Sequence, residues 1–276
     1  MSELPLRPEV FAILSALIEE RSGVYYAPDD RELLADRVST RALEAGFESL
    51  LDYYYFLRYD DPGGAEFDAL LDALVVNETY FFRELDQLET LVDGLVAPAA
   101  RAGARPRVWS AACSTGEEPL TIAMLLAERG LLGAVDLVAS DVSRRALDRA
   151  RRGEFGPRAL RQGAPEPLAR HWLDGPPGGP LRARPELAAA VDWRRVNLAD
   201  PAQVASVGPC DVVACRNVLI YFRDATVRRV VDSLASVLKP GGALFVGVSE
   251  SLLRLGTGLQ CEERRGTFFY RKAAPP

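Results

Sequence analysis

Between residues 105 and 271 the chain alternates short apolar runs with amphipathic helical stretches, and no other feature restricts its fold as strongly. The apolar runs are RVWSAA, VDLVAS, DVVAC and ALFVGV, and the clearest helical stretches are 120–129 and 226–238. Such alternation is typical of a mostly parallel sheet with helices on both faces. We therefore predict an α/β domain here, with a late antiparallel strand at 267–271.

Two other regions have a different pattern. The first 75 or so residues carry apolar residues at helical spacing, in three stripes: Val10, Ile13, Leu14, Leu17 and Ile18; Phe47, Leu50, Leu51, Tyr54 and Leu57; and Phe67, Leu70, Leu71, Leu74 and Val75. The segment Gly156–Arg184 is rich in Pro and Gly and reads as an insertion. We predict a helical N-terminal domain over 1–75, a linker over 76–90, and the α/β domain over 91–276, with an inserted subdomain at about 156–194.

Composition and charge exclude several classes of protein. The 276 residues are 48% hydrophobic, as in ordinary soluble domains, and the net charge of −6 disfavours a general nucleic-acid binder. The first residues lack the pattern of a signal peptide, and no apolar run reaches the roughly 18 residues of a membrane helix, so we expect a cytoplasmic protein. The four cysteines show no CxxC spacing and His171 is the only histidine, which disfavours a zinc site and most Ser-His or Cys-His hydrolases.

The segment VWSAACSTGEEP (108–119) connects the first predicted strand to the helix that follows it. In parallel sheets this turn binds ligands, and often a phosphate. Here Glu117 and Glu118 would repel a phosphate, although acids in a first turn also simply complement the helix dipole. Asp141 ends the next strand, where a carboxylate accepts hydrogen bonds from ribose hydroxyls. A ligand with a ribose, an ammonium group and no phosphate chain fits these residues, and S-adenosylmethionine has that description.

Five segments carry a resemblance to a known family: VNETYFFRE (76–84), the turn at 108–119, LVASDVS (137–143), CRNVLIYF (215–222) and GGALFVGVSESL (241–252). In this order they closely resemble the chemoreceptor glutamate O-methyltransferases, the CheR family, over nearly the whole chain. The resemblance implies a Rossmann-like S-adenosylmethionine methyltransferase domain with a small β-subdomain insertion, preceded by an all-helical domain. It also implies methyl ester formation on glutamates of chemoreceptor cytoplasmic helices, in chemotaxis signalling. We expect a monomer that neither binds nucleic acid nor inserts into membranes.

The resemblance implies roles for particular residues. The implied cofactor contacts are Asn77, Thr79 and Arg83 from the linker, Glu117 at the methionine end, Asp141 at the ribose, Asn197 and Leu198 beside the adenine, and Arg216 and Asn217 at the pocket floor. Tyr221 and Arg83 are implied to lie beside the transferred methyl. From the residues alone, simpler interpretations stay open: Asn197 can cap a turn and Arg83 can be a solvated charge.

Two features depart from the family pattern. Val248 stands where many members have a histidine before the Ser-Glu pair, and the basic face of the N-terminal helices is reduced to Arg31, Arg37 and Arg41 among acidic residues. We predict that Arg37 and Arg41, one helical turn apart, dock acidic receptor helices, and a solvated helix face is the alternative. The chemistry needs alignment and water exclusion rather than a general base, because an ionised glutamate is already a nucleophile. A weakly active cofactor-binding module, or methylation of another protein, are the alternative functions.

Overall fold

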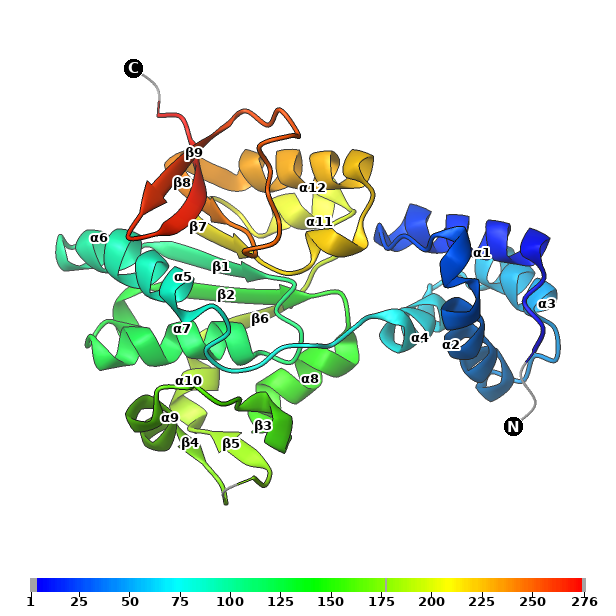
Figure 1. Ribbon diagram of the computed structural model, residues 1–276, viewed down its shortest axis with the longest axis horizontal. Coiled ribbons are helices and arrows are strands. Elements are labelled where there is room, and N and C mark those ends of the chain that lie inside the picture. The colour runs from blue at the N-terminus through cyan, green and yellow to red at the C-terminus, as the bar shows by residue number, and fades with distance from the viewer. Residues whose placement is uncertain (1–3, 177, 275–276) are drawn as a thin grey trace. The chain divides into compact units, whose positions relative to one another are not determined.

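The computed structural model describes residues 4–176 and 178–274, which divide into two compact units (Figure 1). The first unit runs to Val76 and includes Tyr221–Thr226. The second contains Asn77–Ile220 and the residues from Val227 onward.

The N-terminal unit consists of helices. They are α1 (Pro8–Ser22), the short 3-10 turn η1 (Pro28–Asp30), α2 (Arg31–Glu44), α3 (Leu50–Tyr55) with the π-helical turn η2 (Phe56–Asp60), and α4 (Ala65–Leu74). Helix α1 has Pro8 in its first turn, and it ends at Gly23, whose left-handed backbone lets its N–H donate to the Glu19 carbonyl.

The predicted apolar stripes of α1 and α4 are largely buried, but the middle stripe is only partly correct. Helix α3 begins only after Ser49, whose side chain accepts a hydrogen bond from the Asp52 N–H as its N-cap. From that start the buried face is Leu50, Tyr53 and Leu57, and Leu51 is 39% exposed. The prediction that Leu51 belongs to the buried stripe is therefore wrong.

Two arginines of α2 take part in contacts inside this unit. Arg41 donates to both carboxylate oxygens of Glu66 (2.7 and 2.5 Å), and the Tyr53 hydroxyl also donates to Glu66 (2.7 Å). The Arg37 guanidinium donates to the Leu74 carbonyl. The predicted docking face of Arg37 and Arg41 is therefore largely occupied by structural hydrogen bonds.

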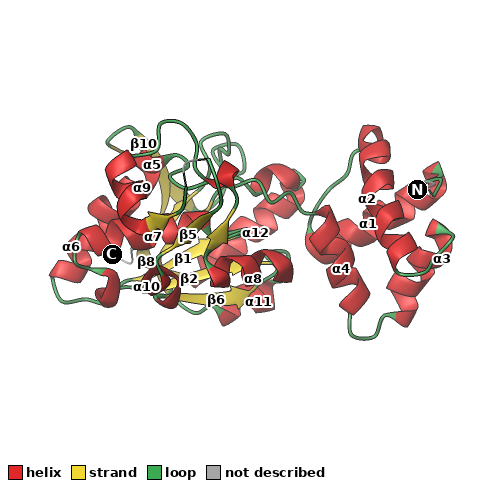
Figure 2. Cartoon of the chain, turned by 90° about the horizontal axis from the view of Figure 1, so that it is seen from below, coloured by secondary structure: helices red, strands yellow, loops and turns green. Residues whose placement is uncertain are grey.

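The second unit contains a seven-stranded sheet in the order β6-β2-β1-β7-β8-β10-β9 (Figures 1 and 2). The five strands from β6 to β8 are parallel, and β10 and β9 continue the sheet antiparallel. The strands are β1 (Arg107–Ala111), β2 (Asp136–Asp141), β6 (Val191–Arg195), β7 (Cys210–Cys215), β8 (Leu238–Phe245), β9 (Leu259–Arg264) and β10 (Thr267–Lys272). The four apolar runs and the late antiparallel strand are confirmed. The chain order reverses between β1 and β7, where open α/β sheets bind their ligands.

Helices cover the sheet and bury its apolar faces. They are α5 (Leu85–Glu89), which continues through the π turn η3 (Thr90–Val96) into α6 (Ala97–Arg101), then α7 (Glu117–Glu128), the 3-10 turn η4 (Leu132–Ala134), α8 (Arg144–Arg152), α10 (Pro185–Ala189), α11 (Pro201–Ser206), the 3-10 turn η6 (Leu219–Tyr221) and α12 (Asp224–Val237).

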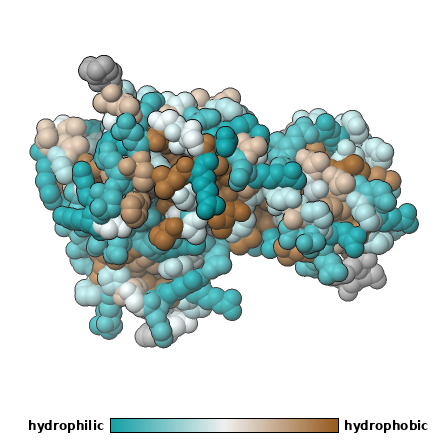
Figure 3. Space-filling model, turned by 45° about the horizontal axis from the view of Figure 1, so that its top comes forward, coloured by the Kyte–Doolittle hydropathy of each residue, from teal (hydrophilic) through white to brown (hydrophobic). Residues whose placement is uncertain are grey.

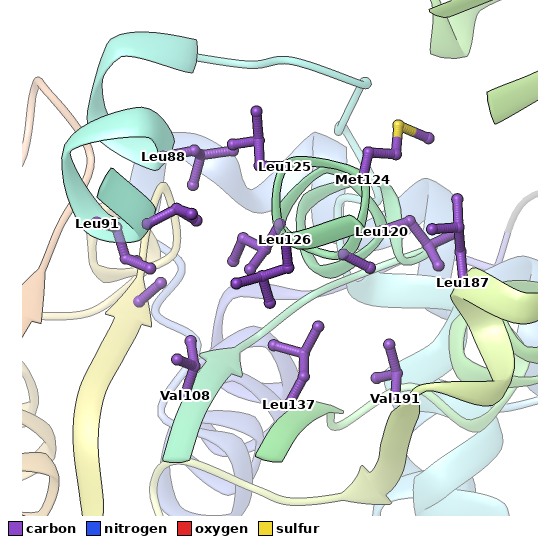
Figure 4. Close-up of a cluster of buried hydrophobic side chains, with 14 of the residues drawn as sticks. Leu88, Leu91, Val108, Leu120, Met124, Leu125, Leu126, Leu137, Leu187 and Val191 are labelled. Atoms are coloured by element: carbon purple, nitrogen blue, oxygen red, sulfur yellow. The ribbon is translucent and has the colours of Figure 1, made fainter. Parts of the chain in front are cut away.

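Figure 4 shows how α7 packs on the sheet. Leu120 and Leu126 of α7 lie above Val108, Leu137 and Val191, which come from β1, β2 and β6. Each fully buried leucine contributes about 1.5–3 kcal/mol to folding. This packing fixes the start of α7, and with it the turn after β1, relative to the ends of the parallel strands.

A small subdomain is inserted between α8 and β6. It contains β3 (Glu154–Phe155), η5 (Pro157–Ala159), α9 (Glu166–Trp172), β4 (Leu173–Asp174) and β5 (Leu181–Ala183), and its antiparallel strands pair in the order β3-β5-β4.

The described residues include no helix long and apolar enough to cross a membrane. Hydrophilic residues dominate the surface in Figure 3, with smaller apolar patches between them.

Candidate active site

Strained backbone is concentrated in the linker and in the loops after the parallel strands. Left-handed φ values outside glycine occur, within the described ranges, at Phe82 and Glu84 of the linker, Ala112 and Ser114 after β1, Asn217 after β7, and Arg265 in the β9–β10 turn. Each such residue costs about 1 kcal/mol or more and persists only where its surroundings hold it. Such strain is frequent at functional sites, which makes these loops the candidate site.

The turn after β1 joins the linker to the end of β2. The Ser114 N–H donates to the Asp141 carboxylate (2.7 Å), and the Ser114 hydroxyl donates to Oδ1 of Asn77 (3.1 Å). Gly116 is required here, because its φ is +95° and a Cβ on it would lie 2.7 Å from the Ala150 Cβ. The structure thus brings Asn77 and Asp141 to one turn, although 64 residues separate them in the sequence.

Glu117 is a buried carboxylate that forms no ion pair. It is 3% exposed, and the Thr115 hydroxyl donates to it (2.7 Å). No lysine or arginine in the described part of the chain forms an ion pair with it. Burial raises the pKa of Glu117 above its ordinary 4.5, and the hydrogen bonds from Thr115 and from its own N–H, together with the more distant charge of Arg149, only partly offset this rise. A cationic group bound beside Glu117 would remove this penalty.

Glu118, its neighbour, is already paired. Its two oxygens accept from the Ser110 hydroxyl (2.7 Å) and from Nη1 of Arg216 (2.7 Å). The Arg216 side chain is only 1% exposed, and it also donates to Gln87 (2.9 Å) and Glu84 (3.1 Å). The two acids of the turn therefore differ in role: Glu118 holds Arg216, while Glu117 lacks a cation.

The linker is fixed to the start of α7. The Phe82 N–H donates to the Thr121 hydroxyl (3.2 Å), which itself donates to the Glu117 carbonyl (2.7 Å). The Arg83 carbonyl accepts from Nη2 of Arg216 (2.7 Å). These bonds hold the strained backbone of the linker at the edge of the sheet.

The side chains of the linker keep more exposure. The Arg83 guanidinium donates to the Glu78 carbonyl (3.0 Å) and lies 5.6 Å from the centre of the Tyr80 ring. Arg83 and Thr79 are both partly exposed. Arg83 is thus held by one hydrogen bond to a carbonyl, and it forms no ion pair among the described residues, although its charge helps to lower the pKa of Glu78.

Asn197 and Leu198 follow β6, the strand beside β2. The Val196 N–H donates to the Asp141 carbonyl (3.1 Å), which places the next residues beside the end of β2. Asn197 Oδ1 accepts from the Ala199 N–H (3.0 Å), and Leu198 is buried. Asn197 therefore does cap a turn, and the structure brings it and Leu198 to the same edge as Asp141.

Asn217 is held by two carboxylates. Its N–H and that of Gly247 both donate to Oε2 of Glu250 (2.7 Å each), and its side-chain amide donates to Glu84 (3.2 Å). Glu84 also accepts from the Val248 N–H (3.3 Å). Val248 itself is 75% exposed, so this contact uses the backbone and does not depend on the residue type at position 248.

Glu84 and Glu250 were missed among the predicted site residues. Burial raises the pKa of Glu84, but the nearby charge of Arg216 and hydrogen bonds from Asn217 and Arg216 outweigh it, and its pKa lies below the ordinary value. Both glutamates stand inside the motifs that carry the resemblance, FFRE and VGVSE, and that position was the available signal.

Tyr221 is the one predicted site residue that does not lie in the second unit. Contacts group it with the N-terminal helices, where its carbonyl accepts from the Tyr25 N–H (2.9 Å).

The other chemically notable side chains lie outside this network or are blocked. His171 is exposed on α9 of the subdomain. Burial raises the pKa of Cys113 and Cys215 well above that of a free thiol, and that of Cys210 to about 11, so all three remain protonated at neutral pH. No cluster of His, Cys, Asp or Glu able to hold a metal ion occurs in the described ranges.

Known families match both units. The SAM binding domain of CheR methyltransferases matches residues 77–266, and the CheR all-alpha domain matches residues 9–75. The chain belongs to the CheR methyltransferase family. It is 38% identical to a chemotaxis protein methyltransferase of Klebsiella aerogenes over 91% of this chain and 86% of that one, and 36% identical to the Escherichia coli protein over 91% and 87%. Chemotaxis protein methyltransferase 2 of Vibrio cholerae is 32% identical over 98% and 96%.

The protein is thus an S-adenosylmethionine-dependent methyltransferase of chemotaxis signalling, as the sequence motifs predicted. The residues at the carboxyl edge fit this cofactor. Glu117 offers a buried negative charge without a cation, and the Gly116 turn lets a ligand approach the backbone. A phosphate would be repelled by Glu117 and attracted by no basic side chain of this turn.

Proposed function

We propose that this CheR family member methylates glutamate side chains on the cytoplasmic helices of chemoreceptors, forming methyl esters. The observation that carries the proposal is that Glu117, which forms no ion pair, and Asp141 lie at the same edge of the sheet. Family membership and the chemotaxis proteins among its relatives support the glutamate substrate.

Each predicted cofactor residue has a proposed task. Glu117 pairs with the ammonium group of the methionine moiety, and Asp141 accepts from ribose hydroxyls. The other predicted residues lie in three segments. Asn77, Thr79 and Arg83 of the linker 76–90 contact the cofactor, Asn197 and Leu198 lie beside the adenine, and Arg216 with Asn217 supports the pocket from below. When bound, S-adenosylmethionine supplies an electrophilic methyl group on a sulfonium.

In this proposal Arg216 and Asn217 support the pocket floor and do not contact the cofactor themselves. The hydrogen bonds of Arg216 go to protein groups, among them Glu84 and Glu118, which supports a role in fixing the floor rather than in direct cofactor contact. The amide of Asn217 is likewise directed to Glu84.

The protein's share of the chemistry is alignment. A glutamate carboxylate is ionised at neutral pH, so no base has to remove a proton. Arg83, whose guanidinium is partly exposed and forms no ion pair in the described structure, orients the incoming carboxylate. The Tyr221 hydroxyl is assigned a position near the transfer site. Exclusion of water then favours attack by the carboxylate oxygen.

Methyl transfer from labelled S-adenosylmethionine to purified chemoreceptor cytoplasmic fragments tests the proposal. We expect label that mild base releases, as a methyl ester requires. Base-stable label would indicate N-methylation. Label on another protein only would indicate a different substrate. Absence of transfer together with weak S-adenosylhomocysteine binding would indicate a degenerate cofactor module.

We further propose that the protein works as a monomer in the cytoplasm, without binding nucleic acid. Size-exclusion chromatography with light scattering, at the concentration used for the transfer assay, tests the monomer.

A further inference from the structure

Positive charge is concentrated in one part of the chain. Residues 144–195 contain twelve arginines and six acidic residues, a net charge of +6, whereas the whole chain has −6. The rest of the chain therefore carries −12. A basic segment inside an acidic protein needs an explanation, because a uniformly acidic surface would serve solubility equally well.

Helix α8 carries the densest part of this charge. Its nine residues include five arginines, all exposed: Arg144, Arg145, Arg149, Arg151 and Arg152. Its apolar residues, such as Leu147, are buried against the sheet, so the helix presents its charged side to solvent.

The acids nearby leave a surplus of positive charge. Glu154 pairs with two arginines, Arg152 (3.8 Å) and Arg182, so one negative charge serves two positive ones. No acidic side chain in the described residues pairs with Arg145 or with Arg158 of η5, and both are exposed.

These arginines form one surface. Arg145 and Arg149 are one helical turn apart, about 5–6 Å between their Cβ atoms. Nη2 of Arg149 lies 3.5 Å from where a Cβ on Gly156 would stand, and Arg158 follows two residues later. We call Arg145, Arg149, Arg152 and Arg158 the α8 face.

The α8 face starts next to the candidate cofactor site. Helix α8 is capped by Ser143, whose N–H donates to the Asp141 carboxylate (2.9 Å). Nine helical residues span about 13 Å, so the whole face lies within about two and a half turns of the end of β2.

We propose that the α8 face docks an acidic helical segment that carries the glutamate to be methylated. This rests on the proposed function, and it names the surface through which the substrate is recognised. Acidic side chains one turn apart on such a helix match the spacing of Arg145 and Arg149. A short peptide segment fits within the face, whereas a nucleic acid or an anionic membrane extends beyond it and also meets the −12 of the remaining chain.

The test is the double charge reversal Arg145→Glu and Arg158→Glu, since neither arginine has an ion pair to lose. The matched control is Arg101→Glu with Arg228→Glu, two exposed arginines of α6 and α12 that also lack ion pairs in the described structure. We expect the α8 reversal to raise the apparent KM for the receptor fragment roughly three- to tenfold at low salt, with kcat and S-adenosylhomocysteine affinity unchanged. The difference should shrink at high salt because exposed charges are screened, and the control should behave as the unmodified protein.

An unchanged KM in the α8 reversal, with normal transfer by the unmodified protein, overturns the proposal. Loss of binding to RNA or to phosphatidylserine vesicles with an unchanged KM also overturns it, in favour of that partner. If the unmodified protein transfers no methyl to the receptor fragment, the proposed function itself fails. Direct binding of poly-L-glutamate, weakened by the α8 reversal and unaffected by the control, then still supports an acidic peptide as the ligand of the face, and the absence of such binding overturns it.

Discussion

Replacing Glu117 by Gln should weaken the binding of S-adenosylhomocysteine, the product formed from the cofactor. The same substitution should raise the stability of the ligand-free protein. The carboxylate is 3% exposed and has one side-chain hydrogen bond, from Thr115. A charge-assisted contact to the ligand's ammonium contributes about 1.5–3 kcal/mol, so S-adenosylhomocysteine should bind roughly tenfold to 150-fold more weakly. Adenosine, which lacks the ammonium, should bind almost equally to both proteins.

The stability effect has a defined pH dependence. The pKa of Glu117 is raised in the folded state, so its protonated form is favoured by folding, and that stabilisation is lost as the pH rises through the raised value. Glu117→Gln should therefore increase the free energy of unfolding at pH 7 and match the parent near pH 4. The affinity of the parent for S-adenosylhomocysteine should fall as the pH is lowered towards that pKa, because binding needs the ionised form, and the variant should lack this dependence.

Isothermal titration calorimetry between pH 5 and 8, with urea unfolding of the empty proteins, measures both effects. Equal weakening of adenosine and S-adenosylhomocysteine would refute the ammonium pairing and favour a role in helix-dipole complementation. Destabilisation of the empty protein at pH 7 would refute the argument that this carboxylate lacks a cation.

Three other substitutions test the surrounding structure. Asp141→Ala should weaken the binding of S-adenosylhomocysteine by about 1.5–3 kcal/mol, measured by calorimetry. Because this carboxylate also accepts hydrogen bonds from backbone N–H groups, Tm should fall by a few degrees without loss of the fold. An unchanged affinity would show that Asp141 does not belong to the site. Gly247→Ala places a Cβ 2.5 Å from a side-chain nitrogen, so urea unfolding should show that the free energy of unfolding falls by about 1–3 kcal/mol. In the control Gly258→Ala the new Cβ has no atom within 4 Å, and stability should hardly change. Equal effects of the two substitutions would contradict the steric argument. Arg41→Ala leaves the Glu66 side chain, which is 14% exposed, without its cation, so thermal unfolding should show that the free energy of unfolding falls by about 1–3 kcal/mol. The KM for receptor fragments should stay constant. A raised KM at unchanged stability would instead support the predicted docking role of α2.

The sheet was predictable because a parallel strand that is buried on both faces has a nearly continuous apolar sequence. VDLVAS is apolar on both faces, since helices cover both sides of β2, and it could be recognised without a partner. The place of Asp141 then followed, because the carboxyl end of such a strand is where ligands bind in open α/β sheets.

Polar partners were not predictable in the same way. Arg216 donates hydrogen bonds to Glu84, Gln87 and Glu118, which lie about 98 to 132 residues earlier in the sequence. No periodic pattern in the sequence indicates which polar side chains form such contacts. The same limit affected Arg41, which reads as a solvated helix charge until Glu66, 25 residues later, is seen beside it.

One edge of the apolar stripe of helix α3 was predicted wrongly. Leu50 and Leu57 of the predicted stripe are buried, but Leu51 is 39% exposed and Tyr53, which was not in the stripe, is buried instead. Leu51 and Tyr53 lie at opposite edges of the stripe formed by Leu50 and Leu57, and an apolar pattern does not show which edge meets the core.

The acids of the site explain why its chemistry can work without a histidine. Four glutamates lie at the carboxyl edge, and three are stabilised by partners within the protein: Glu84 and Glu118 share the single charge of Arg216, and Glu250 accepts from backbone N–H groups. These three hold the strained loops that shape the site. Of these four, Glu117 is the most buried one that forms no ion pair and accepts from only one hydroxyl and its own N–H, and its raised pKa shows that burial outweighs these contacts and the charge of Arg149. We infer that this cost of burial is tolerated because a cationic ligand removes it on binding, so that the same free energy that destabilises the empty turn contributes to the affinity of the occupied one.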